Sequence, residues 1–456
     1  MKKLLKLTSA VLCAVMLTGT LSGCGGIGPG SSDNTVTIWS GGTGSKSEFD
    51  KVVREFNDTI GKEKNIKIIH EAKENMNQAM SVALQSGQAP DLFQQGSVAE
   101  YAEKGWISAL DDLPGGPELI EKYKDLLVDF KQVYQGKTYS LPSAKTTYGL
   151  VYNKELFKEA GIVDENGEAK PPKTLDEVRE YAKILTDDSK KQYGIVLPLK
   201  WSGWFSTEVK NVVRACAGYT GYDPTTGVYD FSCYKPVLEM LMGIKADNSY
   251  MPGAEGLDND PARARFANGN IGMKFAANWD VGVFNDQFPA EFDWGVAPMP
   301  TISEDERYLQ DVVYNTGYKI SKASVDKGNG ENIMFVYNWL LTNEAQRELY
   351  KICYADPIHH DIVADIDPST LKKGYKEFSE LGDISVLAPL EPQVDISGEV
   401  TLERNFIDNV WAGTMSIDEA IEHHNKVMND GVKKYKELNP DYDLEQFIIP
   451  DWDTRR

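Results

Sequence analysis

The most chemically suggestive residues of the chain are three neighbours, Asn278, Trp279 and Asp280, which follow the strand-like stretch GNIGMKF. An indole can stack on the apolar face of a ring, while an amide and a carboxylate pair with hydroxyl groups at its edge. The three residues therefore predict reversible binding of a hydroxylated ring at a strand end. The alternative is a core tryptophan that only terminates the strand.

Two other tryptophan-bearing segments are candidates for the same site. Trp39 leads into Ser40-Gly41-Gly42-Thr43-Gly44, a glycine-rich turn that lets the backbone approach a ligand, so Trp39, Ser40 and Thr43 are predicted contacts. A phosphate-binding loop is the weaker alternative, because no Gly-Lys-Ser or Gly-Lys-Thr ending follows. One of Trp201 and Trp204, between a strand and a helix, is expected to line the site. The remaining tryptophans are assigned to the core or, for the last, to a terminal contact: Trp106, Trp294, Trp339, Trp411 and Trp452.

Patterns for catalysis and metal binding are weak. His359-His360 and His423-His424 are adjacent pairs, so their side chains diverge instead of converging on a metal. The Asp365-Ile366-Asp367 and Asp441-Tyr442-Asp443 stretches could bind calcium, but both lack the glycine and distal glutamate of a calcium loop. The carboxylate pair of a glycosidase stays open, because it requires only a suitable separation in space. We expect a protein that is not an enzyme and has no cofactor or resident metal.

The elements that must position these residues alternate along the chain. TVTIWS and NIKIIHE are rich in β-branched residues and predict buried strands, and PDLFQQG predicts a short third strand. Between them, apolar residues recur with helical spacing at Phe49, Val52, Val53 and Phe56 and at Met76, Met80, Ala83 and Leu84. The order βαβαβ predicts a parallel sheet covered by helices on both faces.

Further helices are indicated by caps and by apolar composition. Thr174 with Glu177, and Ser416 with Glu419, have the spacing of a capping box at a helix N-terminus. The stretch 331–350 is apolar nearly all round in its first half, which predicts one buried helix.

The N-terminus has the pattern of an export signal. Three lysines precede an apolar run of about ten residues, which is too short to span a bilayer. Leu21-Ser22-Gly23-Cys24 follows and resembles the lipobox of bacterial lipoproteins, which implies cleavage before Cys24 and lipidation of its thiol. We therefore predict a signal peptide over 1–23 and a lipidated cysteine with a flexible tether over 24–34. The alternative is an ordinary signal peptide with a chance cysteine.

Charge and cysteine content narrow the range of partners. The net charge is −21, and removal of 1–23 takes away three lysines and no acidic residue, which makes it −24. This sign argues against nucleic acid and against adhesion to anionic lipid. Cys216, Cys233 and Cys353 remain besides the anchor. An odd number is a poor disulfide framework, so three buried thiols are favoured and one Cys216–Cys233 bridge stays possible.

Several motifs occur in a fixed order over nearly all of the mature chain. They include QSGQAPDLFQQGS, GKTYSLPSAKTTYGLVYNKELFKEAGI, FANGNIGMKFAANWD, YNTGYKISKAS and VWAGTMSIDEAIEHHNKV. Each is weak alone, but their order behind a lipobox resembles one family, the extracellular solute-binding lipoproteins of ABC sugar importers related to maltodextrin-binding proteins.

The resemblance implies a two-lobed α/β fold of the periplasmic-binding-protein type, with hinge crossovers, a ligand cleft between the lobes, and a closed form that a permease recognises. The implied division is lobe 1 over 35–143 and 315–357, and lobe 2 over 144–314 and 358–456. The crossovers are expected near Pro142 to Lys145, Asp311 to Tyr314 and Ala355 to His359.

The resemblance also adds Gln95, Thr146 and Tyr148 to the expected ligand contacts. Thr146 stands where the maltodextrin relatives have an acidic sugar ligand, and Gln95 where they have an aromatic residue. These departures put maltodextrin specificity in doubt and leave the class unaffected.

The function implied is that of a monomeric receptor tethered to the outer face of the plasma membrane. It would capture a sugar or oligosaccharide and deliver it to an ABC permease. The alternatives are another uncharged or cationic solute, such as a peptide or polyamine, and a glycan-degrading surface lipoprotein.

Overall fold

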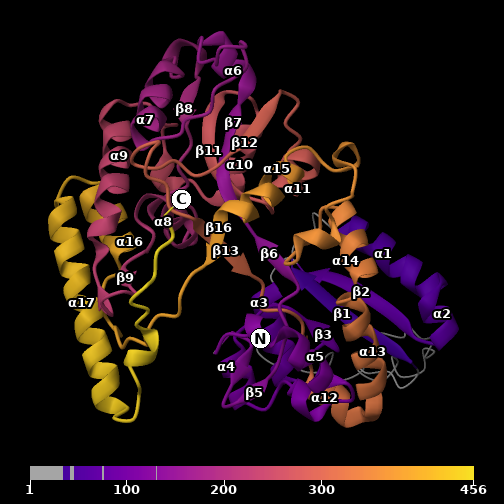
Figure 1. Ribbon diagram of the computed structural model, residues 1–456. Helices are drawn as coiled ribbons and strands as arrows, with labels where there is room; N and C mark the ends of the chain where they lie inside the picture. Colours follow the sequence, from indigo (N-terminus) through magenta and orange to yellow (C-terminus); the bar gives the residue numbers. More distant parts are fainter. Residues whose placement is uncertain (1–33, 42–45, 74–75, 130, 456) are drawn as a thin grey trace, which may run out of the picture.

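The computed structural model describes residues 34–41, 46–73, 76–129 and 131–455. The elements gather into two α/β groups, joined by strands that include β6 (Ala144–Thr146) and β13 (Gln310–Tyr314) (Figure 1). We call the group with the N-terminal strands the first lobe and the other the second lobe. The predicted signal peptide, Cys24 and Thr43 lie outside the described residues.

The first lobe is built on a four-stranded sheet with the order β14–β3–β1–β2. β1 (Thr35–Gly41) pairs in parallel with β2 (Lys67–Lys73) and β3 (Leu92–Phe93), and β14 (Lys319–Ile320) is antiparallel. The predicted βαβαβ order is confirmed. The helices of this lobe are α1 (Lys46–Asp58), α2 (Ile60–Lys64), α3 (Met76–Gln85), α4 (Val98–Glu103), α5 (Gly116–Tyr123), α12 (Lys322–Ser324), α13 (Gly330–Leu340) and α14 (Asn343–Lys351).

The stretch 331–350 forms two helices, so the prediction of a single helix is wrong. α13 ends at Leu340, and Thr342 caps α14 by accepting a hydrogen bond from the Ala345 N–H. A threonine hydroxyl that satisfies a helix-start amide stabilises a new N-terminus at the expense of continuation. The first half is buried as predicted, with Ile333 and Val336 fully enclosed.

The second lobe is built on a mixed sheet with the order β12–β7–β11–β8. β7 (Tyr148–Asn153) is antiparallel to β11 (Ile271–Ala277) and β12 (Trp294–Ala297), and β8 (Tyr193–Ile195) is parallel to β11. All residues of β7 and β11 are buried, which requires cover on both faces. The helices of this lobe are α6 (Lys154–Glu159), α7 (Leu175–Ile184), α8 (Lys210–Ala217), α9 (Lys235–Ala246), α10 (Asn259–Ala267), α11 (Asp280–Gly282), α15 (Tyr375–Glu380), α16 (Leu402–Asn405) and α17 (Ile417–Leu438).

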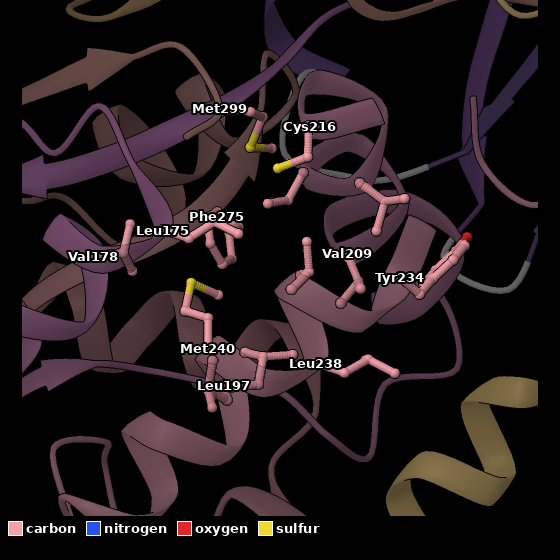
Figure 2. Packing of buried hydrophobic residues seen from close by; sticks show 14 of the residues in the cluster. Leu175, Val178, Leu197, Val209, Cys216, Tyr234, Leu238, Met240, Phe275 and Met299 are labelled. Atoms are coloured by element: carbon pink, nitrogen blue, oxygen red, sulfur yellow. The ribbon is translucent and has the colours of Figure 1, made fainter. Parts of the chain in front are cut away.

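The main core lies between this sheet and the helices beside it. Figure 2 shows Leu175 and Val178 of α7, Leu238 and Met240 of α9, and Phe275 of β11 packed together. Both predicted helix starts are confirmed, and Ser416 forms a complete capping box on α17. The box predicted at Thr174 is only half formed, because the Glu177 carboxylate accepts from the Lys173 N–H instead of from Thr174. Cys216 and Cys233 are buried free thiols and Cys353 is a partly buried free thiol, so the Cys216–Cys233 bridge is not formed.

A third sheet joins the lobes, with the order β15–β6–β13–β16. β6 is antiparallel to β13 and to β15 (Asp356–Pro357), while β16 (Ser385–Leu387) is parallel to β13. The three segments predicted as crossovers therefore lie side by side. β6 is followed directly by β7, whose first residue, Tyr148, pairs with Ala277 at the end of β11, where the Trp279 segment begins.

Candidate functional site

The indole of Trp279 is the most accessible large aromatic group in the described part of the chain. It is 42 % exposed and stands edge-on to the ring of Tyr148, with centroids 5.7 Å apart and an interplanar angle of 89°. A core tryptophan would not retain such exposure, so the structure favours the ligand-facing alternative. Tyr148 itself is only 4 % exposed, so its predicted role as a ligand contact is corrected to a support for the indole. This burial raises the pKa of its hydroxyl well above the usual value.

The two neighbours of Trp279 are held by the protein. Asn278 donates from Nδ2 to the Lys145 carbonyl (3.1 Å) and from its backbone N–H to the Thr147 carbonyl (3.1 Å). The Asp280 carboxylate is 1 % exposed and accepts from the Ala277 N–H and from Arg263. Its predicted role as a ligand contact is therefore corrected, because both oxygens are occupied inside the protein. Within the described residues, the Asn278 amide keeps its Oδ1 and the second N–H of Nδ2 for a ligand.

The joining sheet contributes a residue that the sequence did not single out. Thr146 is partly buried and lies directly opposite Val313 in the β6–β13 pair, and Val313 is 42 % exposed. Residues directly opposite in an antiparallel pair share one face of the sheet. The side chains of Thr146 and Val313 therefore lie on the same face of the joining sheet. Thr146 is two positions before Tyr148 in the sequence. Val313 is identified only by the strand pairing, because nothing in the sequence of the crossover distinguishes this valine as a candidate ligand contact.

In the first lobe, the loop after β3 presents Gln95 with a free acceptor. Gln95 Oε1 is buried and has no hydrogen-bond partner within the described residues. Lys319 holds this loop in place. Its side chain is fully buried and donates to the Gln94 carbonyl and to Thr316 Oγ1. Burial lowers the pKa of Lys319 to about 7. Buried acceptors are normally paired, so Gln95 is a candidate for a ligand hydroxyl.

The end of β1 contains a buried hydrogen-bonded chain with the connectivity of a Ser-His-Asp triad. Ser40 Oγ lies 2.7 Å from His70 Nε2, and His70 Nδ1 lies 2.8 Å from Asp50 Oδ1. Burial lowers the pKa of His70, against the opposing effect of Asp50, so the imidazole is neutral at pH 7. Ser40 is only 5 % exposed. We therefore correct its predicted role from ligand contact to structural residue, since the hydroxyl is enclosed and already paired.

Trp39 is partly buried, and one face of its indole is covered by Lys73, whose Nζ lies 4.1 Å from the ring centroid. Such a cation–π contact leaves only the other face for stacking. The predicted ligand role of Trp39 stays a prediction.

The pair at 201 and 204 divides between surface and core. Trp204 is fully buried, so its predicted role as a cleft residue is corrected to core packing. Trp201 is partly buried at the edge of the same cluster and keeps the ligand-facing prediction. The tryptophans assigned to the core are buried at 294, 339 and 411 and partly buried at 106, and Trp452 packs on Arg214 near the C-terminus.

Within the described ranges, none of the helices combines the length and apolar composition of a membrane span. The same residues include no group of three or more His, Cys, Asp or Glu side chains arranged to hold a metal ion.

The chain is similar in sequence to several solute-binding proteins. The maltotriose-binding protein of Pyrococcus abyssi is 26 % identical over 285 residues, which cover 61 % of this chain and 56 % of the relative. The sn-glycerol-3-phosphate-binding periplasmic protein UgpB of Escherichia coli is 26 % identical over 292 residues, covering 60 % and 63 %. The matched part of these relatives is thus less than two thirds of their length.

The fold is shared with a solved structure, the maltose/maltodextrin-binding domain MalE from Bdellovibrio bacteriovorus bound to maltotriose. The TM-score is 0.64 at 18 % identity, covering 88 % of this chain and all of that domain. This likeness confirms the two-lobed α/β fold. A family model for the bacterial extracellular solute-binding protein matches residues 40–347. Since this match covers more than half of the chain, the protein belongs to the family of bacterial extracellular solute-binding proteins.

Proposed function

We propose that this protein captures a sugar or oligosaccharide outside the cell and delivers it to the permease of an ABC importer. The observation that carries the proposal is the half-exposed indole of Trp279, held edge-on against Tyr148 beside the first crossover. An exposed indole face, fixed in orientation by a neighbouring ring, is suited to stack on the apolar face of a sugar ring. One relative is named for maltotriose, and a protein of the same fold has bound maltotriose, which supports a carbohydrate.

The described groups suggest how a sugar would be held. The indole of Trp279 would stack on the apolar face of a sugar ring, with Val313 beneath a second apolar edge. Thr146 Oγ1 and Asn278 Oδ1 would meet hydroxyls from the second-lobe side. Gln95 Oε1 would accept a hydrogen bond from a sugar hydroxyl on the first-lobe side, which gives the closed form a hydrogen bond that the open form lacks.

The division into lobes is part of the proposal. We assign 35–143 and 315–357 to lobe 1, and 144–314 and 358–456 to lobe 2. The packing supports this, because Val36 and Val336 share one apolar cluster while Leu150 and Phe406 share another. A hinge at the joining sheet would let the lobes close on ligand and present the closed form to the permease.

The attachment to the membrane is proposed from the lipobox. Cys24 would carry the lipid, and the chain after it would work on the outer face of the membrane as a monomer. Replacement of Cys24 by alanine is expected to release the protein or leave it uncleaved. Acyl chains on the Cys24→Ala protein would contradict this part of the proposal.

Calorimetry on the chain that begins after Cys24 tests the main claim. The panel contains neutral oligosaccharides of several lengths and linkages, sn-glycerol-3-phosphate, a short peptide and spermidine. We expect saturable binding of a neutral oligosaccharide that Trp279→Ala weakens by about 2 kcal/mol or more. Trp294→Phe is the control, because Trp294 is a buried tryptophan of the same lobe and its change affects stability alone.

Three results would contradict the proposal. Binding confined to the phosphate, the peptide or the polyamine would reject the carbohydrate. Equal affinity in wild type and Trp279→Ala would reject the site. Shortened products after long incubation with the bound oligosaccharide would support the glycan-degrading alternative instead.

A further inference from the structure

Trp279 lies in a short turn whose two ends are anchored by different parts of the protein. Asn278 holds the first end to the carbonyls of Lys145 and Thr147, at the first crossover. Asp280 holds the second end to the interior of the second lobe. Among the residues that the structure describes, none forms a hydrogen bond with the Trp279 indole, so its direction depends on these anchors and on Tyr148.

The Asp280 carboxylate closes the turn around the tryptophan. Its Oδ2 accepts the Ala277 N–H at 2.9 Å, which spans the two residues between them. Its Oδ1 accepts from Arg263 Nε of α10. Both contacts involve a charged group that is almost completely removed from water, where such bonds are strong and losing one partner is costly.

The Arg263 guanidinium forms one buried ion pair and one exposed ion pair. Its Nε faces the buried Asp280, while its Nη1 lies 2.8 Å from Oδ1 of Asp260, one turn before it on α10. The Asp260 side chain is well exposed, so that pair contributes little. The structure thereby offers a matched control on the same guanidinium.

A second buried pair lies against the first. Lys274 of β11 donates to Glu208 Oε1 at 2.6 Å and to the Phe275 carbonyl at 2.6 Å, and both side chains are buried. Burial raises the pKa of Glu208 and the Lys274 ammonium opposes this rise, while Asp280 and Arg263 have smaller effects of opposite sign. We call Glu208, Arg263, Lys274 and Asp280 the buried charge cluster. Its two positive and two negative groups come from four separate segments of the lobe.

We propose that Asp280 and Arg263 are positioning residues that hold the Trp279 indole in its ligand-facing orientation, with the Lys274–Glu208 pair as their support. The part of this inference that concerns affinity rests on the proposed function. The part that concerns the indole's orientation does not, because it can be measured without ligand.

The test uses protein labelled with 5-fluorotryptophan, which has nine fluorine signals, one for each tryptophan. Trp279→Phe assigns the signal of residue 279. In Asp280→Asn we expect this signal to shift or broaden while the other eight keep their positions. In Asp260→Asn all nine are expected to stay unchanged. Arg263→Lys, which keeps the charge but lacks the planar guanidinium, should give the same selective change and guards against misfolding of Asp280→Asn.

The second measurement is a double-mutant cycle on affinity for the oligosaccharide found by calorimetry. Asp280→Asn should weaken binding at least tenfold when Trp279 is present and less than twofold in the Trp279→Ala background. Non-additivity of this kind is expected when one residue acts through the other.

An unmoved Trp279 signal in folded Asp280→Asn and Arg263→Lys would overturn the positioning role. A change of all nine signals would also count against it, because it indicates a general structural role. If Trp279→Ala binds as tightly as wild type, the proposed site fails, while the fluorine signals still decide whether the cluster positions the indole.

Discussion

The turn after β11 and the end of β1 have similar sequences but differ in how far their tryptophan is exposed. Each places a tryptophan beside small polar residues at a strand end, and each was predicted to contact ligand. At the turn after β11 the polar neighbours are bound by the protein and the indole is exposed. At the end of β1 the polar neighbour Ser40 is also bound, but the indole of Trp39 is covered on one face by Lys73.

The difference teaches that polar residues beside a tryptophan do not reveal which group faces the ligand. Asp280 and Ser40 appeared suited to bind hydroxyls, and both bind the protein instead. A carboxylate or hydroxyl at a strand end has backbone N–H groups and buried side chains within reach, and pairing with these avoids a desolvation cost. The indole has few such partners, so its exposure is the more informative observation.

The largest expected effect concerns the support of the second-lobe turn. Lys274→Met leaves Glu208 buried without its cation and is expected to lower the free energy of unfolding by about 3–5 kcal/mol at pH 8. Burial raises the pKa of Glu208 to about 7, so at pH 5 the carboxyl is protonated and the loss should be smaller. Urea unfolding at both pH values checks this. An equal loss at pH 5 and 8 would contradict it.

Next in size is the contrast between two tryptophans of the second lobe. Trp204→Ala removes a fully buried side chain and should lower the free energy of unfolding by about 3–5 kcal/mol. Trp279→Ala should change the melting temperature of the ligand-free protein little. Thermal unfolding of both variants measures the contrast, and a comparable loss for Trp279→Ala would return that residue to the core.

The first lobe should respond to pH through Lys319. Its folded-state pKa, lowered to about 7, lies below that of an unfolded lysine, so the folded protein binds fewer protons between about pH 7 and 10. Stability should therefore rise with pH above 7, by at most about 1.4 kcal/mol per pH unit. Unfolding of Lys319→Met between pH 7 and 9 should lack this rise. A slope equal to that of wild type would show that Lys319 titrates normally.

The smallest effect is expected at the end of β1. Ser40→Ala removes the hydroxyl that pairs with His70 and should cost about 1 kcal/mol of stability. Affinity for the oligosaccharide should stay within twofold, because the hydroxyl is enclosed. Denaturant unfolding and calorimetry on the same sample provide both values. A tenfold loss of affinity with unchanged stability would restore Ser40 to the ligand site.

Local patterns in the sequence determined the elements of this protein. The βαβαβ start and the caps at Thr174 and Ser416 follow from periodicity and hydrogen-bonding side chains, whereas the three crossover segments were implied only by the resemblance to a known family. These features act over a few neighbouring residues, so the sequence contains their cause directly. The break within 331–350 also has a local cause, because Thr342 is a residue type that caps helices and starts the second helix there.

Only the tertiary structure decided which of the candidate side chains are enclosed or already paired inside the protein. Val313 is opposite Thr146 through a contact between residues 167 positions apart in the chain. Asp280 is bound by an arginine of α10 and Ser40 by a histidine of β2, while Trp204 is enclosed by a core that several helices and a sheet complete. Whether a polar group is free depends on every partner that folding brings within hydrogen-bond distance, and those partners come from distant segments whose approach no local pattern encodes.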